Sequence, residues 1–254
     1  MSNGGGNGFM LEGVRQLGAV AIFLVRLLGE CVPALGRPRL LVHQIYNAGA
    51  RSIIIIMLSG LFVGMVLGLQ GYDLLARFGS VEALGTAAAL GLLKELAPVV
   101  TALLFAGRAG TALTSEIGLM RATDQLTAME IMAVDPLRYV AAPRFLGGVL
   151  AMPLLAAIFS IIGLYGAQLI GVELMGIDKG AFWSQMQGSV ALRNVTEGVV
   201  KSVVFGIACS LIAVHEGYHA APTAEGVALA TTRTVVASSV ITLLLDYVLT
   251  AAFL

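Results

Sequence analysis

The chain has 254 residues, of which 58% are hydrophobic and 12% are charged. Soluble domains carry roughly 45–50% apolar and 25% charged residues, so this composition excludes an ordinary water-soluble protein. Fifteen basic and fifteen acidic residues give a net charge of zero, which offers no general field to attract nucleic acid. Because backbone polar groups in lipid must be satisfied internally, we expect an all-α integral membrane protein with no nucleic-acid partner.

The first 42 residues contain an apolar stretch, 16–25, that is too short to cross a bilayer. On a helical wheel Glu12, Arg15, Arg26 and Glu30 fall within one narrow arc, with apolar residues around the rest of the wheel. This pattern predicts a helix lying in the membrane interface, within an N-terminal segment of residues 1–42. A sixth membrane span is the alternative.

Five later stretches are candidates to cross about 30 Å of hydrocarbon at about 1.5 Å per residue. They are 52–72, 83–107, 145–172, 198–214 and 234–254, and we expect them to form one membrane domain over residues 43–254. The first is the clearest, because it is uncharged between Arg51 and Asp73, whereas the third, also uncharged, contains Pro153. The fourth is short, and the last two each contain a charge.

Arginine and lysine residues are distributed unevenly between the two sides of these spans. One side has Arg15, Arg26, Arg37, Arg39 and Arg51 before the first span and Arg108, Arg121, Arg138 and Arg144 between the second and third, whereas Arg77, Lys179, Arg193 and Lys201 mark the other. Cytoplasmic loops carry the excess of basic residues, so the N-terminus is predicted to be cytoplasmic. An odd number of spans then places the C-terminus on the far side.

Four charged residues lie inside the predicted spans: Lys94, Glu95, Lys201 and Asp246. A charge at the centre of a bilayer costs at least about 2.5–3.5 kcal/mol, so such groups normally face the protein interior. We expect them to pair with one another or to line a wet cavity, with a structural role or a role in gating.

The first span carries Gly60, Gly64 and Gly68, a repeated small residue at every fourth position. Such a face allows another helix to approach closely. It predicts either packing within the helix bundle or the border of a moving or lipid-lined interface.

The polar segment 108–144 can leave the membrane and still form helix. Thr123 can cap a helix that continues to about Val134, where Asp135-Pro136 would end it because the residue before proline avoids helical angles. Leu126, Met129 and Ala133 would share one face of this helix, and Met120, Met129 and Met132 would offer an adaptable apolar surface for a partner. A short amphipathic helix on the cytoplasmic side favours a docking element; a solvated loop helix is the alternative.

Residues 215–219 read HEGYH, which matches the zinc-protease pattern H-E-x-x-H. His215 and His219 on one helix could bind zinc with Glu216 as general base, and Asp246 could supply a third ligand. Against this, Gly217 weakens the helix inside the motif. The sequence has no G-x-x-x-x-G-K-[ST] loop, so if ATP drives this protein it is hydrolysed on a separate chain.

From about residue 43 to its end, the sequence resembles the MlaE family of permeases, the membrane subunits of ABC-type phospholipid transporters in Gram-negative bacteria. The resemblance rests on QIYNAG (44–49), GLQGY (68–72), LLKELAPVVTALLFAGRAG (92–110), EIGLMRATDQLTAMEIMAVDPL (116–137) and ATTRTVV (230–236). The segment before residue 43 resembles the family's elbow helix in character alone.

The resemblance implies a homodimer in the bacterial inner membrane that moves phospholipids between the two membranes and so maintains outer-membrane lipid asymmetry. Its expected partners are an ABC ATPase dimer that binds the ATP, a STAS-domain regulator and a periplasmic MCE-domain hexamer. The segment of about 118–135 would be the coupling helix, with Arg121, Glu130, Asp135, Pro136 and Arg138 as its ATPase-coupling residues. No cofactor or metal is expected in this chain, and HEGYH would be an accident of the sequence.

The family resemblance also implies that the paired first spans border the lipid site. Helical spacing places Leu67, Gly71, Leu74, Leu75 and Phe78 on one face, which we assign to the acyl tails, and Gln70 and Tyr72 are assigned to the headgroup region. Packing of these residues against neighbouring helices is the alternative. Two other functions remain open: an intramembrane zinc protease using HEGYH, and an ion-coupled secondary transporter using Glu95 and Asp246.

Overall fold

A computed structural model describes residues 5–253, with side chains described at residue 18 and from residue 20 onward. Within that range the chain is helical and contains no strand, as predicted from the sequence. Five helical stretches are long and apolar enough to cross a membrane: Pro38–Arg77, Val81–Ala122, Leu137–Leu174, Leu192–Tyr218 and Ala224–Phe253. The five predicted spans are therefore confirmed, and each helical stretch begins before its predicted span.

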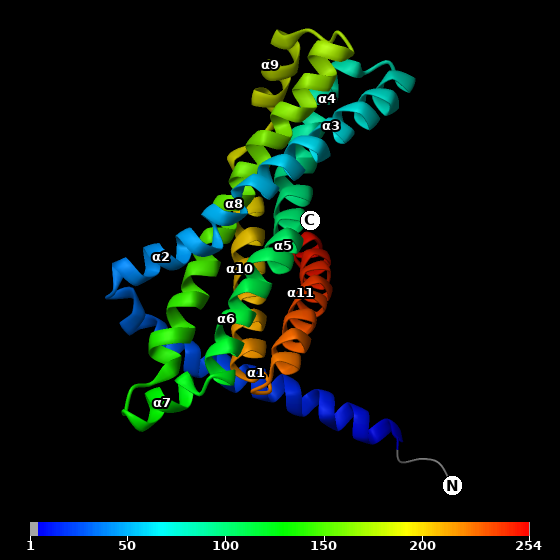
Figure 1. Ribbon diagram of the computed structural model, residues 1–254. Helices are drawn as coiled ribbons and strands as arrows, with labels where there is room; N and C mark the ends of the chain where they lie inside the picture. The colour runs from blue at the N-terminus through cyan, green and yellow to red at the C-terminus, as the bar shows by residue number, and fades with distance from the viewer. Residues whose placement is uncertain (1–4, 254) are drawn as a thin grey trace.

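The helices along the chain are α1 (Gly5–Leu35), α2 (Pro38–Ala48), α3 (Ile53–Arg77), α4 (Leu84–Gly91), α5 (Ala97–Phe105), α6 (Thr111–Ala122), α7 (Gln125–Ile131), α8 (Ala142–Gln168), α9 (Lys179–Ser189), α10 (Leu192–Tyr218) and α11 (Ala224–Phe253). The boundary expected between residues 42 and 43 falls inside α2, and Gly36–Arg37 separates α1 from α2. In Figure 1, α7 and α1 lie at the lower end of the bundle and α9 at the upper end.

Helix α1 packs across the lower end of the bundle and is not among the spanning helices (Figure 1). Phe23, Leu27, Cys31 and Ala34 recur every three or four residues and are buried against the ends of α6, α8 and α10. This single buried stripe is the arrangement of an interfacial helix. The side chains of Glu12 and Arg15 lie outside the described ones.

The glycine face of α3 packs against α8 in the same chain. A Cβ atom added to Gly64 would collide with the carbonyl oxygen of Gly163, and one added to Gly60 or Gly68 would lie 3.0 Å from a carbonyl oxygen of α8. At these distances the two helix backbones are in direct contact, with no side chain between them. The repeated glycine is thus used for packing within the bundle, and the opposite face of α3 is exposed.

Two prolines shape the second and third spans. A proline cannot donate a backbone hydrogen bond and its ring crowds the carbonyl four residues earlier. Wide π-helical turns at Leu92–Leu96 and Leu137–Ala141 precede Pro98 and Pro143, so the helix accommodates each proline without breaking. The first of these turns contains Lys94 and Glu95.

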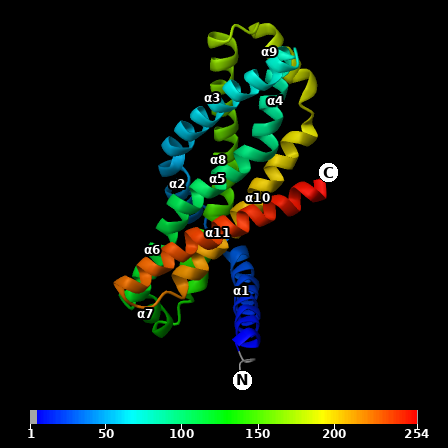
Figure 2. The ribbon, with the colours of Figure 1, turned by 90° about the vertical axis from the view of Figure 1, so that its right-hand side faces the viewer.

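Helix α11 runs diagonally across the bundle and its C-terminal end lies level with α5 (Figure 2). Its contacts are with α10, α6 and α5. Thr234, Ser238 and Thr242 face inward and are fully buried, whereas Val236, Val240, Leu244 and Tyr247 are exposed on the outer side. The C-terminal part of α11 brings Asp246 to Lys201 of α10 and Thr250 to Glu95 in the π-helical turn Leu92–Leu96.

Candidate functional site

The C-terminal half of α3 forms one wall of a groove against α4. Four predicted lipid-binding residues line it, together with Leu84, Ala87 and Ala88: they are Leu67, Gln70, Gly71 and Leu74. The groove encloses about 230 Å³ and its walls are mainly apolar. It lies toward the upper end of the bundle, which is the end opposite α7 (Figure 1).

The other three predicted lipid-binding residues do not line this groove. Tyr72 and Leu75 pack against a buried cluster of Leu84, Ile177 and Phe182, and Phe78 follows the last residue of α3 with 75% of its surface exposed. The face expected for these residues is therefore divided: Leu67, Gly71 and Leu74 line the groove, Leu75 packs against the buried cluster, and Phe78 is exposed. The reason is that α9 covers this end of α4, a contact between distant segments that helical spacing cannot reveal.

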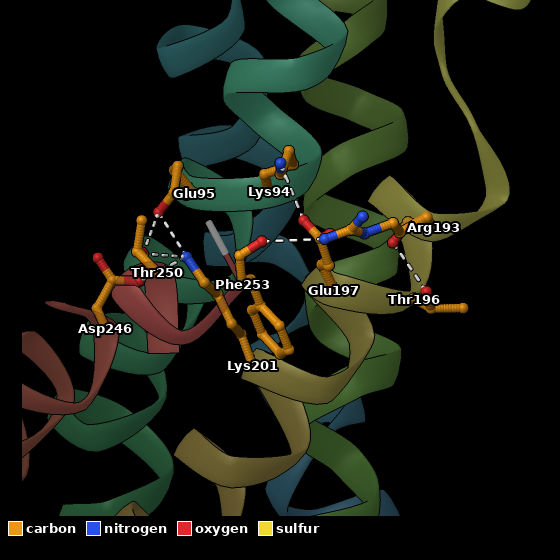
Figure 3. Close-up of polar contacts among 9 residues, drawn as sticks. All are labelled: Lys94, Glu95, Arg193, Thr196, Glu197, Lys201, Asp246, Thr250 and Phe253. Atoms are coloured by element: carbon orange, nitrogen blue, oxygen red, sulfur yellow. Dashed lines mark hydrogen bonds and ion pairs between the residues drawn. The ribbon is translucent and has the colours of Figure 1, made fainter. Parts of the chain in front are cut away.

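Lys201, on α10, is the centre of a buried polar network (Figure 3). Its ammonium lies 2.6 Å from Glu95 Oε2 and 3.0 Å from Asp246 Oδ1, and it donates a hydrogen bond of 2.7 Å to the Thr250 hydroxyl. The side chain of Lys201 is 2% exposed, against 40% for Glu95 and 24% for Asp246. An ammonium has three donors, and here all three have acceptors. The expected pairing of these charges is found for Lys201, Glu95 and Asp246.

Lys94 belongs to a second ion pair beside the first (Figure 3). Its ammonium lies 2.9 Å from Glu197 Oε2, and Arg193 lies 2.8 Å from the other oxygen of the same carboxylate. Glu197 is 6% exposed and was not singled out from the sequence. The signal was present, because Glu197 precedes Lys201 by four residues and therefore shares its helix face. The two clusters together contain three cations and three carboxylates, so their charges balance.

Local backbone geometry brings these groups together. The π-helical turn at Leu92–Leu96 carries Lys94 and Glu95 toward α10, and a Cβ atom added to Gly198 would collide with the carbonyl oxygen of Leu93. This close approach lets side chains of ordinary length meet across the two helices. Four of these charged residues line a cavity of about 300 Å³: Lys94, Glu95, Glu197 and Lys201. It is completed by Leu90, Gly91, Thr250 and Phe253.

The expected docking helix differs from the one observed. The sequence predicted one helix from Thr123 to about Val134, but α6 continues to Ala122 and α7 spans Gln125–Ile131. Thr123 does not cap α7: its hydroxyl donates to the Leu119 carbonyl, and Asp124 takes a left-handed conformation at the break. Asp135 accepts a hydrogen bond from the Leu137 amide, so Asp135-Pro136 starts the next helical turn and does not end the previous one.

Two of the predicted ATPase-coupling residues, Arg121 and Arg138, have partners elsewhere in the chain. Arg121 donates to the carbonyl oxygen of Tyr218 at 2.6 Å and so satisfies the end of α10. Arg138 lies 4.0 Å from Glu30 of α1, and Glu130 is exposed on α7. The predicted methionine surface is divided: Met120 and Met129 pack inward, while Met132 is 66% exposed. Ile131, at 83% exposure, adds to the apolar surface at the tip.

The side chains of the HEGYH sequence pack against α1. Phe23 inserts among three of its rings, with centroid distances of 5.3 Å to His215, 5.7 Å to Tyr218 and 5.5 Å to His219. His219 Nδ1 lies 2.9 Å from the carbonyl oxygen of His215. Burial lowers the pKa of His219 below its usual range. The motif therefore anchors an interfacial helix through aromatic packing.

The proposed third zinc ligand lies elsewhere. Asp246 pairs with Lys201, which precedes His215 by fourteen residues and so lies about 21 Å away along α10. Among the side chains that the structure describes, no three of His, Cys, Asp and Glu gather to hold a metal ion.

Five spanning helices packed around a buried ion network define a multi-pass membrane protein. The chain belongs to the MlaE permease family, whose model, described as permease MlaE, matches residues 41–252. It is 51% identical over 250 residues to the intermembrane phospholipid transport system permease protein MlaE of Haemophilus influenzae, which covers 94% of this chain and 96% of that protein.

More distant relatives share the same region. A probable ABC transporter permease protein of Rickettsia prowazekii is 34% identical over 214 residues, covering 84% of this chain and 83% of that protein. The chloroplastic protein TRIGALACTOSYLDIACYLGLYCEROL 1 of Arabidopsis thaliana is 29% identical over 212 residues, covering 84% of this chain and 61% of that protein. These matches agree with the family resemblance seen in the sequence motifs.

Proposed function

We propose that this chain is the permease subunit of an ABC-type transporter that moves phospholipids between the inner and outer membranes of a Gram-negative bacterium. The observation that carries the proposal is family membership across nearly the whole chain, with a relative at 51% identity that is named as an intermembrane phospholipid transport permease. By moving phospholipids, the transporter would maintain the lipid asymmetry of the outer membrane.

The α3–α4 groove is the proposed site for the lipid. Leu67, Gly71 and Leu74 supply apolar contacts for acyl chains, and Gln70 supplies an amide for the headgroup region. The arginine distribution supports a periplasmic position for this groove, because α7 and the basic 108–144 segment lie at the other end of the bundle. A periplasmic MCE-domain hexamer would exchange the lipid there.

ATP hydrolysis is assigned to a separate ABC ATPase dimer, because this sequence has no nucleotide-binding loop. The exposed tip of α7, with Ile131 and Met132, offers an apolar contact for that ATPase. A STAS-domain regulator would bind the ATPase. Two copies of this chain would form the permease, and the outer face of α11 supports this through Val236, Val240 and Tyr247, which are more than half exposed.

Affinity purification of the tagged chain from its own membranes tests the assembly. We expect an ATPase chain containing a nucleotide-binding loop, a STAS-domain chain and an MCE-domain chain in the eluate. Lipid transport that continues after deletion of that ATPase would refute the proposal and favour an ion-coupled secondary transporter.

Photo-crosslinking tests the lipid site directly. A photoreactive residue at position 67, 70 or 74 should capture phospholipid in intact membranes, and its yield should change when ATP hydrolysis is blocked. The matched control is Phe62, which is 56% exposed on α3 but outside the groove. If capture at Phe62 responds to ATP as strongly as capture in the groove, the groove is not the lipid site.

A further inference from the structure

A second groove lies where α2 and α3 diverge from α8. It encloses about 560 Å³, within the range of roughly 300–1,000 Å³ typical of small-molecule sites. Its walls are almost entirely apolar and include Val42, Tyr46, Ile53, Leu154, Ile158 and Ile161. The groove is separate from the α3–α4 groove, because Leu67 follows Ile53 by fourteen residues, or about 21 Å along α3.

A bend in the chain creates this groove. The helix axis changes direction at Gly49–Ser52, where a short 3-10 turn joins α2 to α3. A Cβ atom at Gly49 would lie 2.8 Å from the Ile45 carbonyl oxygen, so the bend favours glycine at this position. Helix α2 therefore departs from the line of α3, as Figure 2 shows, and leaves an apolar hollow on its α8 side.

The segments that form this groove carry positive charge and no carboxylate. No acidic residue occurs between Glu30 and Asp73, which include α2 and α3, or between Asp135 and Glu173, which include α8. Arg39 and His43 are exposed on α2, and no described side chain forms an ion pair with either. They adjoin Val42 and Tyr46 of the groove wall, so the positive charge of Arg39 and the imidazole of His43 lie at its margin.

The polar margin and the apolar wall of the groove follow one another as the headgroup and the acyl chains do in a phospholipid. Arg39 and His43 lie in the first half of α2, whereas Ile53 and Ile161 lie farther along α3 and α8. Because α2 begins on the side that the arginine distribution predicts to be cytoplasmic, the charged end would meet the headgroups of the cytoplasmic leaflet. The apolar end then extends toward the acyl chains.

We propose that this α2–α8 groove holds one acyl chain of an anionic phospholipid from the cytoplasmic leaflet, with the phosphate beside Arg39 and His43. The lipid is a bound companion of the permease and is not the molecule in the α3–α4 groove. It fills the hollow at the bend and so supports the angle between α2 and α3. Polybasic protein surfaces attract anionic lipids by about 1 kcal/mol per basic residue, and an adjoining apolar hollow adds contact with the acyl chain.

Lipid retention measured on the purified full-length chain provides the test. The protein is reconstituted with equal amounts of phosphatidylglycerol and phosphatidylcholine, extracted, and examined by native mass spectrometry. We expect preferential retention of phosphatidylglycerol, reduced about fivefold by Arg39→Gln and restored by Arg39→Lys. Arg77→Gln is the matched control, because Arg77 is an exposed arginine at the opposite end of α3. Equal retention of the two lipids, or equal effects of Arg39→Gln and Arg77→Gln, would overturn the proposal.

A second variant tests the apolar part of the groove. Ala157 is exposed and lines the hollow, so Ala157→Phe should fill it without disturbing a buried contact and should reduce phosphatidylglycerol retention. A photoreactive residue at position 158 should capture lipid in intact membranes more strongly than one at Ile54, which is 80% exposed beside the groove. Equal capture at both positions would indicate ordinary bilayer contact, and capture of a polypeptide at position 158 would assign the groove to a partner's membrane helix; either result refutes the proposal.

Discussion

Replacing Lys201 by methionine should destabilise the protein strongly. The side chain is 2% exposed, and its removal leaves the carboxylates of Glu95 and Asp246 without a cation. Breaking a buried ion pair by deleting one partner costs about 3–5 kcal/mol. Glu95 is 40% exposed and can be partly solvated, so we expect a value near the lower limit, about 3 kcal/mol. At about 2–4 °C per kcal/mol for a protein of this size, the melting temperature should fall by roughly 6–12 °C.

The assay is thermal unfolding of the purified protein in one detergent, compared with a triple variant that combines Lys201→Met, Glu95→Gln and Asp246→Asn. Removing all three charges leaves no unpaired ion among them, so the triple variant should recover most of the lost stability. Arg77→Met is the control, because the Arg77–Asp73 pair is 72% exposed on both sides and should contribute about 0–1 kcal/mol. The reasoning fails if Lys201→Met is as stable as Arg77→Met. Lipid transport by the triple variant then separates a structural role of the network from a role in gating.

Three further predictions concern other parts of the chain. A C-terminal alkaline phosphatase fusion should be active and a C-terminal green fluorescent protein fusion dark, since five spans follow a cytoplasmic N-terminus; the reverse result would contradict the topology. Ile131→Asp on the exposed tip of α7 should leave the protein inserted but separate ATP hydrolysis from lipid transport, and normal coupled transport in reconstituted vesicles would count against docking at that tip. Burial lowers the pKa of His219, so the unfolded state binds more protons than the folded state below about pH 6.5, and the free energy of unfolding should fall on acidification. This fall should be smaller in a His219→Phe variant. An equal pH dependence of the melting temperature in both proteins would exclude His219 as the cause.

The sequence alone was sufficient for the membrane class, the five spans and the family. Hydropathy is a local property, so an uncharged run such as 52–72 indicates a span without knowledge of its neighbours. A charge inside an apolar run is equally visible, which is why Lys94, Glu95, Lys201 and Asp246 could be selected and their pairing expected. The absence of a nucleotide-binding loop could also be read directly.

Tertiary structure decided which partners these residues meet. The adjacent residues Lys94 and Glu95, both in the π-helical turn at Leu92–Leu96, meet different partners on α10: Lys94 pairs with Glu197, and Glu95 pairs with Lys201. Likewise α9 covers Tyr72 and Leu75, and α1 brings Phe23 to the HEGYH rings. Helical periodicity determines which residues share a face, but not which distant helix packs against it. That choice depends on the close approach of whole helices, set by bends and small residues such as Gly198, and it appears only when the chain is folded.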